Sequence, residues 1–174
     1  MTVEEFAVFS AGRGRCELLE GEVYDLVPPG PIHGSVTSRL HYHVTHHTYQ
    51  HGLGETYAAE TGFVGRDGRT VRAPDVAFIT KDRLPAEPEA PYGRTLPDLI
   101  AEVVSPSDRP GEVATKMRWW LEQGVKLVWI VEPESKTLTA YLPDGAARVY
   151  GVADTLTAED VLPGFALDVS KIFE

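Results

Sequence analysis

Residues 99 to 131, LIAEVVSPSDRPGEVATKMRWWLEQGVKLVWIV, constrain the fold more than any other part of the chain. The first and last segments of this stretch, LIAEVV and KLVWIV, are short apolar runs typical of strands buried inside a sheet. Between them, EVATKMRWWLEQG has the apolar spacing of an amphipathic helix. Because no tight turn can join two parallel strands, a helical crossover of this kind is expected between them. The stretch therefore predicts a βαβ unit.

Other segments predict antiparallel strands and a further helix around this unit. CELLEGEVYDL predicts a hairpin that turns at Glu20-Gly21, and apolar residues repeat every four positions between Pro31 and about Gln50, which indicates a helix. TYAAETGFVG and VRAPDVAFIT, joined by RDGR, predict an antiparallel pair. TLTAYL and ARVYG predict a terminal hairpin around PDG, and LPGFALDVSKIF follows as a packed tail. Residues 81–97 contain four prolines and indicate a functional flap or a mobile loop.

These elements give the order hairpin, helix, three strands, helix, strand, hairpin. We expect an α/β (α+β) fold in which a mixed central β-sheet is flanked by helices and extended by extra N- and C-terminal β-hairpins. A chain of 174 residues with 43% hydrophobic residues is long enough for one compact domain, so residues 1–174 are predicted to form a single domain.

Charge and targeting signals narrow the classes of function. The net charge of −10 provides no overall basic field, so a nucleic-acid role would depend on local geometry. Cys16 is the only cysteine and cannot form an intramolecular disulfide. The first residues are acidic, and no apolar run approaches the ~20 residues that span a bilayer. We expect a cytoplasmic protein without a membrane partner.

Two carboxylates interrupt apolar strands. Glu102 shares a strand face with Ile100 and Val104, and Asp75 begins the strand that continues as VAFI. Burying an ionised carboxylate costs on the order of several kcal/mol of folding free energy unless it is paired, protonated or bound to a cation. If the two strands are neighbours, these acids could together bind Mg²⁺ or Mn²⁺. Either acid could instead pair with an arginine or accept hydrogen bonds from a loop.

Lys116 lies on the predicted helix, about sixty degrees from the centre of its apolar stripe. The lysine stem could therefore cover the core while the ammonium group reaches the edge of the sheet. The alternative is a surface ion pair with Glu112, which lies four residues earlier in the favoured order and which the pattern slightly favours. Arg118 is turned far from the stripe and should face solvent.

Several motifs together resemble a known family. ELLEGEVYDLVPPGPIHG, RAPDVAFI, LIAEVVSPSDR, GVKLVWIVEP and LPGFALDV occur in the order found in the Uma2 family, formerly a domain of unknown function (DUF820) and often labelled restriction endonuclease. The resemblance covers nearly the entire chain. It implies membership of the PD-(D/E)xK nuclease superfamily, whose restriction-endonuclease-like core has the order helix, three strands, helix, strand.

The resemblance implies an endonuclease that hydrolyses phosphodiester bonds in nucleic acid, most simply DNA, with Mg²⁺ or Mn²⁺ as cofactor. Asp75 and Glu102 match the metal-binding acids of the superfamily. The water-positioning lysine should stand two residues after the second acid, where this chain has Val104, and the family resemblance supplies Lys116 instead. Glu17 and His33 match recurring family positions and could line the same site. Glu17 could equally stabilise its hairpin, and His33 could be a core or capping imidazole.

Other readings of the sequence remain open. The histidines between His41 and His51 include i, i+4 pairs that could bind zinc or nickel, or they could form a partly exposed helix face. Four arginines could form a phosphate-facing patch or could be scattered over the surface: Arg66, Arg69, Arg72 and Arg94. A homodimer could place two sites on one duplex. The main alternative to a nuclease is a catalytically inactive binding or structural module with the same fold.

Overall fold

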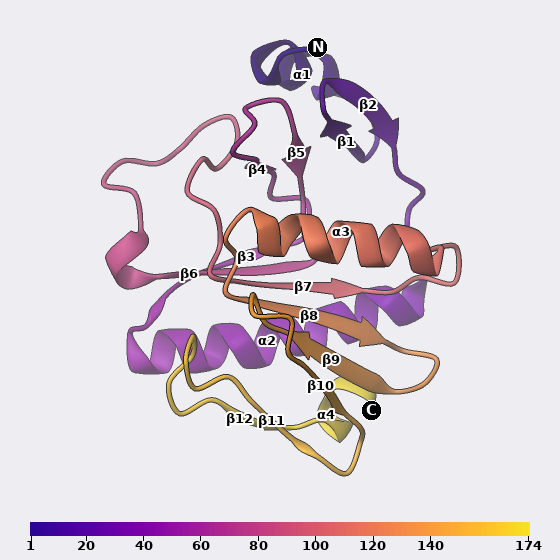
Figure 1. Ribbon diagram of the computed structural model, residues 1–174, viewed down its shortest axis with the longest axis vertical. Helices are drawn as coiled ribbons and strands as arrows, with labels where there is room; N and C mark the ends of the chain where they lie inside the picture. The colour runs from indigo at the N-terminus through magenta and orange to yellow at the C-terminus, as the bar shows by residue number, and fades with distance from the viewer.

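A six-stranded mixed sheet forms the centre of the computed structural model, which describes residues 1–174 (Figure 1). The order of its strands is β10-β9-β8-β7-β6-β3. The predicted βαβ unit is confirmed, since β7 and β8 pair in parallel with Glu102 opposite Ile130, and all other pairs in the sheet are antiparallel. The strands are β3 Gly54–Ala58, β6 Val76–Thr80, β7 Leu99–Val103, β8 Leu127–Glu132, β9 Thr137–Tyr141 and β10 Ala147–Tyr150.

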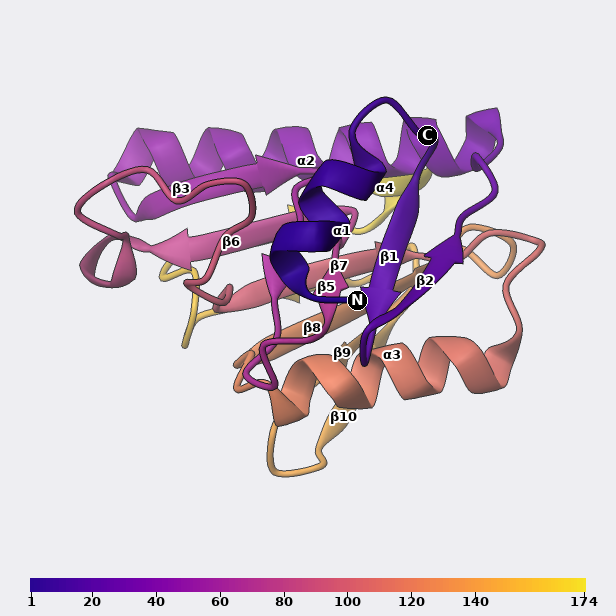
Figure 2. The same cartoon turned by 90° about the horizontal axis from the view of Figure 1, so that it is seen from above.

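Two long helices cover opposite faces of this sheet (Figures 1 and 2). Helix α2, Pro31–His51, begins with Pro31 in its first turn and ends at Gly52, which adopts the left-handed conformation typical of a helix C-terminus. Helix α3, Pro110–Glu122, forms the crossover between β7 and β8. The order α2, β3, β6, β7, α3, β8 reproduces the expected core of helix, three strands, helix and strand.

A separate four-stranded sheet and helix α1, Val3–Ser10, lie beyond α3 (Figures 1 and 2). The strand order is β2-β1-β5-β4. The predicted N-terminal hairpin is confirmed, with left-handed backbone at Glu20 and Gly21 in its turn. The sequence reading missed α1, although Thr2 and Glu5 form a capping box at its start. The strands are β1 Cys16–Leu19, β2 Glu22–Asp25, β4 Phe63–Val64 and β5 Val71–Arg72.

The predicted antiparallel pairing of TYAAETGFVG and VRAPDVAFIT is confirmed, but neither segment is a single strand. Each segment is divided between the two sheets: β3 and β6 pair in the central sheet, whereas β4 and β5 pair across the predicted RDGR turn in the small sheet. The first segment breaks near Glu60, whose φ is 73°, and the second breaks at Pro74, which cannot donate to a strand ladder. This division places Asp75 at the junction of the two sheets.

The core has one apolar layer on each face of the central sheet. The layer under α2 includes Val36, Leu40 and Phe78, and the layer under α3 includes Ile100, Trp120 and Ile130. Leu99, Ala101 and Val103 point into the α2 layer, so side-chain alternation puts Glu102 on the α3 side. Glu102 is therefore an acid within the apolar layer that α3 covers.

The C-terminal segment closes the α2 side of the molecule (Figure 1). The predicted hairpin of β9 and β10 is confirmed, and the tail adds strands β11 Thr155–Thr157 and β12 Ala166–Asp168 and helix α4 Ser170–Phe173. Residues 81–97 contain only the short 3-10 helix η1, Lys81–Arg83. No helix combines the length and hydropathy needed to cross a membrane.

Candidate active site

Asp75 is fixed at the point where the chain passes from the small sheet to β6. The backbone N–H of Asp75 donates to the carbonyl of Ala101, and its Oδ2 accepts from the N–H of Val103 at 2.8 Å. Oδ2 also lies 3.1 Å from Nε2 of His33, in the first turn of α2. The other carboxylate oxygen, Oδ1, has no hydrogen-bond partner in the chain. Asp75 thus has one oxygen held by protein and one available.

Glu102 lies near the carboxyl end of β7 and faces α3. The indole Nε1 of Trp120 donates to Oε1 of Glu102 at 2.9 Å, and Nζ of Lys116 donates to Oε2 at 2.9 Å. Both donors come from α3, four residues apart, so they lie on the same side of that helix. The sequence reading treated Trp120 only as a core residue, although its spacing from Lys116 could have indicated the shared contact.

Lys116 connects Glu102 to the small sheet. Its Nζ lies 3.3 Å from Oε1 of Glu17 on β1 as well as 2.9 Å from Glu102. Arg72 donates to Oε2 of Glu17 at 3.1 Å, and the N–H of Ala73 donates to Oε1. The structure therefore brings together side chains from both sheets and from α3, all of them largely buried.

The sequence pattern slightly favoured a surface ion pair between Lys116 and Glu112, and that alternative is wrong. Glu112 is exposed and forms no ion pair with Lys116, whose side chain is only 23% exposed. The lysine turns inward because two buried carboxylates attract it more strongly than one solvated carboxylate can. Arg118 is exposed, as predicted.

The electrostatics of the site follow from three carboxylates in a small volume. Burial raises the pKa of Glu102 to about 7, with the nearby charges of Asp75 and Glu17 adding to the effect and Lys116 opposing it. Burial also raises the pKa of Asp75, but the hydrogen bond and charge of His33 and the Val103 amide outweigh it, so this pKa falls below its ordinary value. Asp75 is therefore ionised at neutral pH, and Glu102 is near its titration point.

The pKa of Lys116 is raised, whereas burial alone would lower it. Burial favours the neutral amine, but Glu102 and Glu17 attract the ammonium ion more strongly and raise the pKa of Lys116 above its ordinary value. Lys116 therefore stays charged at neutral pH. It can donate hydrogen bonds and stabilise negative charge, but it cannot accept a proton.

Glu17 and His33 both lie at this site. Glu17 pairs with Arg72 and Lys116, rather than serving only its own hairpin, and His33 contacts Asp75. Thr37, one turn further along α2, lies 3.5 Å from the other ring nitrogen of His33. Arg72 was considered only as part of a surface patch, although it lies three residues before Asp75.

The donor set suits a hard divalent cation. Asp75 and Glu102 supply carboxylate oxygens, which Mg²⁺ and Mn²⁺ prefer, and Mg²⁺ sites commonly use only one or two carboxylates together with water and phosphate oxygens. No group of three or more His, Cys, Asp or Glu side chains has the arrangement of a metal site. A cation between Asp75 and Glu102 would offset the burial and the repulsion that raise the pKa of Glu102.

The rings of His47 and His51 lie side by side, with centroids 4.3 Å apart, but they belong to no group of three metal-binding side chains. His47 hydrogen-bonds the carbonyl of Pro163, and His51 hydrogen-bonds the carbonyl of His47, so this pair is engaged by backbone groups. The four arginines do not form one patch. Arg72 pairs with Glu17, Arg94 pairs with Glu4, and Arg69 donates to a backbone carbonyl.

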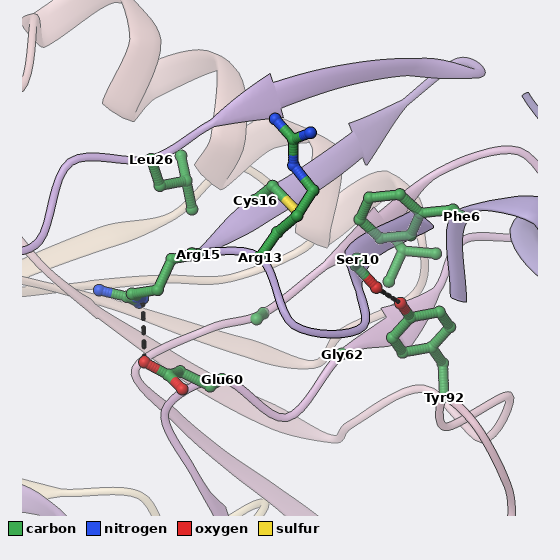
Figure 3. Close-up of a pocket in the computed structure, with 12 residues that line it drawn as sticks. Phe6, Ser10, Arg13, Arg15, Cys16, Leu26, Glu60, Gly62 and Tyr92 are labelled. Atoms are coloured by element: carbon green, nitrogen blue, oxygen red, sulfur yellow. Dashed lines mark hydrogen bonds and ion pairs between the residues drawn. The ribbon is translucent and has the colours of Figure 1, made fainter. Parts of the chain in front are cut away.

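Two cavities lie near these elements. The larger, of about 790 Å³, is bounded by the first turns of α2 and α3 and by the carboxyl ends of β7 and β8, and His33 contributes to its wall. The smaller, of about 180 Å³, lies between α1 and β1 (Figure 3). There Arg15 pairs with Glu60, and the hydroxyls of Ser10 and Tyr92 meet. No carboxylate of the site lines the smaller cavity.

Comparison with known proteins places this arrangement in a family. A structure described as a "putative nuclease belonging to DUF820" from Anabaena variabilis matches with a TM-score of 0.87 and 19% identity over 99% of this chain and 97% of that chain. At this identity the likeness shows a shared fold, which confirms the expected restriction-endonuclease-like core. No curated protein matches the sequence. The model of the family described as "Uma2: Putative restriction endonuclease" matches residues 3–170, so this chain belongs to the Uma2 family.

Proposed function

We propose that the protein is a metal-dependent endonuclease that hydrolyses phosphodiester bonds of nucleic acid. Asp75 and Glu102 would hold Mg²⁺ or Mn²⁺, and Lys116 would position the attacking water. One observation carries the proposal: Nζ of Lys116 lies 2.9 Å from Oε2 of Glu102 although the lysine comes from α3 and not from the strand. The ammonium group of Lys116 therefore lies beside the Glu102 carboxylate, where the ammonium group of a lysine at position 104 would be expected.

The chemistry assigned to each side chain follows from its charge state. A charged Lys116 would donate a hydrogen bond to water and offset the negative charge that develops on the phosphate oxygens. It cannot serve as the general base, because its pKa is raised. Glu102 would act as a metal ligand, and a cation bound to its carboxylate would keep it ionised. His33, through its contact with Oδ2, would fix the orientation of Asp75.

The cation would be held by Asp75 and Glu102, with Oδ1 of Asp75 the oxygen that the protein leaves without a partner. A divalent cation bound there would polarise the phosphate and lower the pKa of a bound water. Glu17 and Arg72 would act through Lys116, since Arg72 offsets the charge of Glu17 and Glu17 helps to hold the ammonium group. These two are positioning residues.

Cleavage assays with single-stranded DNA, duplex DNA and RNA in the presence of Mn²⁺ or Mg²⁺ test the proposal. Asp75→Asn, Glu102→Gln and Lys116→Met should each abolish cleavage, while Glu112→Gln, an exposed change on the same helix, should leave it unchanged. Thermal unfolding of each variant shows that it is folded. Cleavage by all three folded variants at the rate of the parent would refute the roles assigned to these side chains.

The second candidate is a catalytically inactive module with a nuclease fold. It is favoured by the ion pairs of Lys116, because an amine that pairs with two carboxylates can stabilise the fold without taking part in catalysis. The net charge of −10 and the valine at position 104 agree with it. Calorimetry with Mn²⁺ separates the candidates. The inactive module predicts no heat of binding and no cleavage of any of the three substrates.

A further inference from the structure

The larger cavity borders the candidate active site at His33, although Asp75, Glu102 and Lys116 do not themselves line it. His33 contacts Asp75 and also lines the cavity, and Val104, on the cavity wall, follows Glu102 by two residues. Met117, the neighbour of Lys116 on α3, lines it as well. A phosphate held at Asp75 and Glu102 would therefore place its attached nucleoside within reach of this cavity.

The walls of the cavity combine apolar surface with a few polar groups. Val113 and Met117 from α3, Ile130 from β8 and Tyr141 from β9 provide apolar or aromatic surface. Its volume of about 790 Å³ falls within the range of roughly 300–1,000 Å³ that is typical of small-molecule sites. A flat heterocycle fits such walls, because stacking and apolar contact do not depend on the charge of the occupant.

The charged groups of the cavity are all acidic apart from the imidazole of His33. Asp108, Glu132 and Glu134 contribute to its lining, with no lysine or arginine among the lining residues. A phosphate would be repelled there, whereas an amino group would be attracted because carboxylates only accept hydrogen bonds when ionised. The chemistry favours a neutral ring that carries N–H donors.

A serine hydroxyl on the cavity wall is free to bind a polar occupant. Ser105 lines the cavity and is only 9% exposed, yet its Oγ forms no hydrogen bond within the chain. Its backbone N–H, by contrast, donates to Oδ2 of Asp108 at 2.8 Å. Oγ of Ser105 is open to solvent, so it can exchange a hydrogen bond with water for one with a polar occupant.

We propose that this cavity binds an unpaired nucleobase with an exocyclic amino group, adenine, cytosine or guanine, next to the phosphate at Asp75 and Glu102. The assignment rests on the proposed function, since the phosphate position comes from it. A base paired in a duplex cannot enter a side pocket without leaving its stack. The preferred substrate is therefore single-stranded or locally unpaired, and thymine and uracil, which lack the amino group, bind more weakly.

Binding without a divalent metal tests this inference separately from catalysis. Fluorescence anisotropy is measured in EDTA with labelled homopolymers of deoxyadenosine, deoxycytidine and thymidine and with a blunt duplex. The first two should bind about tenfold more tightly than oligothymidine or the duplex, as expected for one good base contact. Ala114→Phe, which fills the cavity from α3, should remove this preference.

Matched variants keep the test informative. Thr115→Phe places the same ring on the exposed side of α3 and should bind as the parent does. Glu132→Gln, an exposed change at the cavity, should reduce the preference over oligothymidine even if Ala114→Phe fails to fold. Equal affinity of the parent for all four probes, or an unchanged preference in both cavity variants, would overturn the inference. Absence of cleavage with Mn²⁺ would refute only the proposed function.

Discussion

Replacing Lys116 with methionine keeps most of the aliphatic stem and removes the ammonium group shared by Glu17 and Glu102. The two carboxylates are only 4% and 9% exposed, and the lysine side chain lies 23% exposed between them. Breaking a buried pair by removing one partner costs roughly 3–5 kcal/mol. Because Lys116 is partly exposed, we expect a loss near the lower end, about 3 kcal/mol at pH 8. For a chain of this size, that corresponds to a fall in Tm of about 6–12 °C.

The pH dependence gives this prediction a specific signature. Without the lysine, the pKa of Glu102 should rise beyond its present value of about 7, which already exceeds the ordinary 4.5. A carboxyl group with a higher pKa in the folded chain binds its proton more tightly when folded. The unfolded value is the same for both chains, so the cost of the substitution is complete above the raised pKa of the variant. It shrinks as the pH falls from there to about 7, and it stays constant at lower pH. A part of the cost remains at low pH because Lys116 also contacts Glu17.

Urea denaturation of the parent, Lys116→Met and Glu112→Gln at pH 5 and pH 8 measures these differences. Glu112→Gln should change the free energy of unfolding by less than about 0.5 kcal/mol at either pH, as is usual for an exposed substitution. A Lys116→Met cost that is the same at both pH values, or that is no larger than the cost of Glu112→Gln at pH 8, would refute the ion-pair reasoning.

Three further predictions follow from the same contacts. Trp120→Phe removes the indole donor to Oε1 of Glu102 and should lower the free energy of unfolding by about 1.5–3 kcal/mol in urea denaturation; a change below about 0.5 kcal/mol would contradict this contact. Asp98 is fully buried, and although burial raises its pKa, the Thr80 amide and two cations hold it below the ordinary 3.8. Asp98→Asn should therefore cost about 1–3 kcal/mol at pH 7, and the cost should vanish as acid titration passes below 3.8. Mn²⁺ at about a hundredfold excess over its Kd should stabilise the parent by about 2.7 kcal/mol in thermal unfolding, and an equal shift in Asp75→Asn would contradict its role as a ligand.

The βαβ unit could be predicted because the patterns that indicate its strands and helix lie within short stretches of sequence. Two apolar runs and an amphipathic helix between Leu99 and Val131 need only strand and helix periodicity to be identified. The division of TYAAETGFVG between β3 and β4 was not predictable in the same way. Both halves have strand-forming residues, and only tertiary pairing decides which sheet each half joins.

The site residues also differ in how far the sequence around each one predicts its role. Asp75 and Glu102 stand out in sequence because each is an acid within an apolar strand. The inward orientation of Lys116 cannot be predicted from the sequence, because Glu112 lies at the spacing of a helical ion pair and is an equally plausible partner. The nearest partner of Lys116, Glu102, is 14 residues away, and its second partner, Glu17, is 99 residues away, since 116 − 17 = 99. Local spacing carries no information about that contact.

The placement of Lys116 on α3 has a structural consequence for the whole molecule. A lysine at position 104 would extend from β7 itself, whereas Nζ of Lys116 reaches Glu102 from the covering helix and also reaches Glu17 on the small sheet. One ammonium group thereby joins three elements that the sequence separates: β1, β7 and α3. The small sheet also meets the α3 layer through Phe63, which packs in that layer, and through the N–H of Arg66, which donates to Gln123. Because the charge to which we assign the chemistry also pairs with the small sheet, loss of Lys116 should disturb both stability and cleavage, and measuring the two together separates the effects.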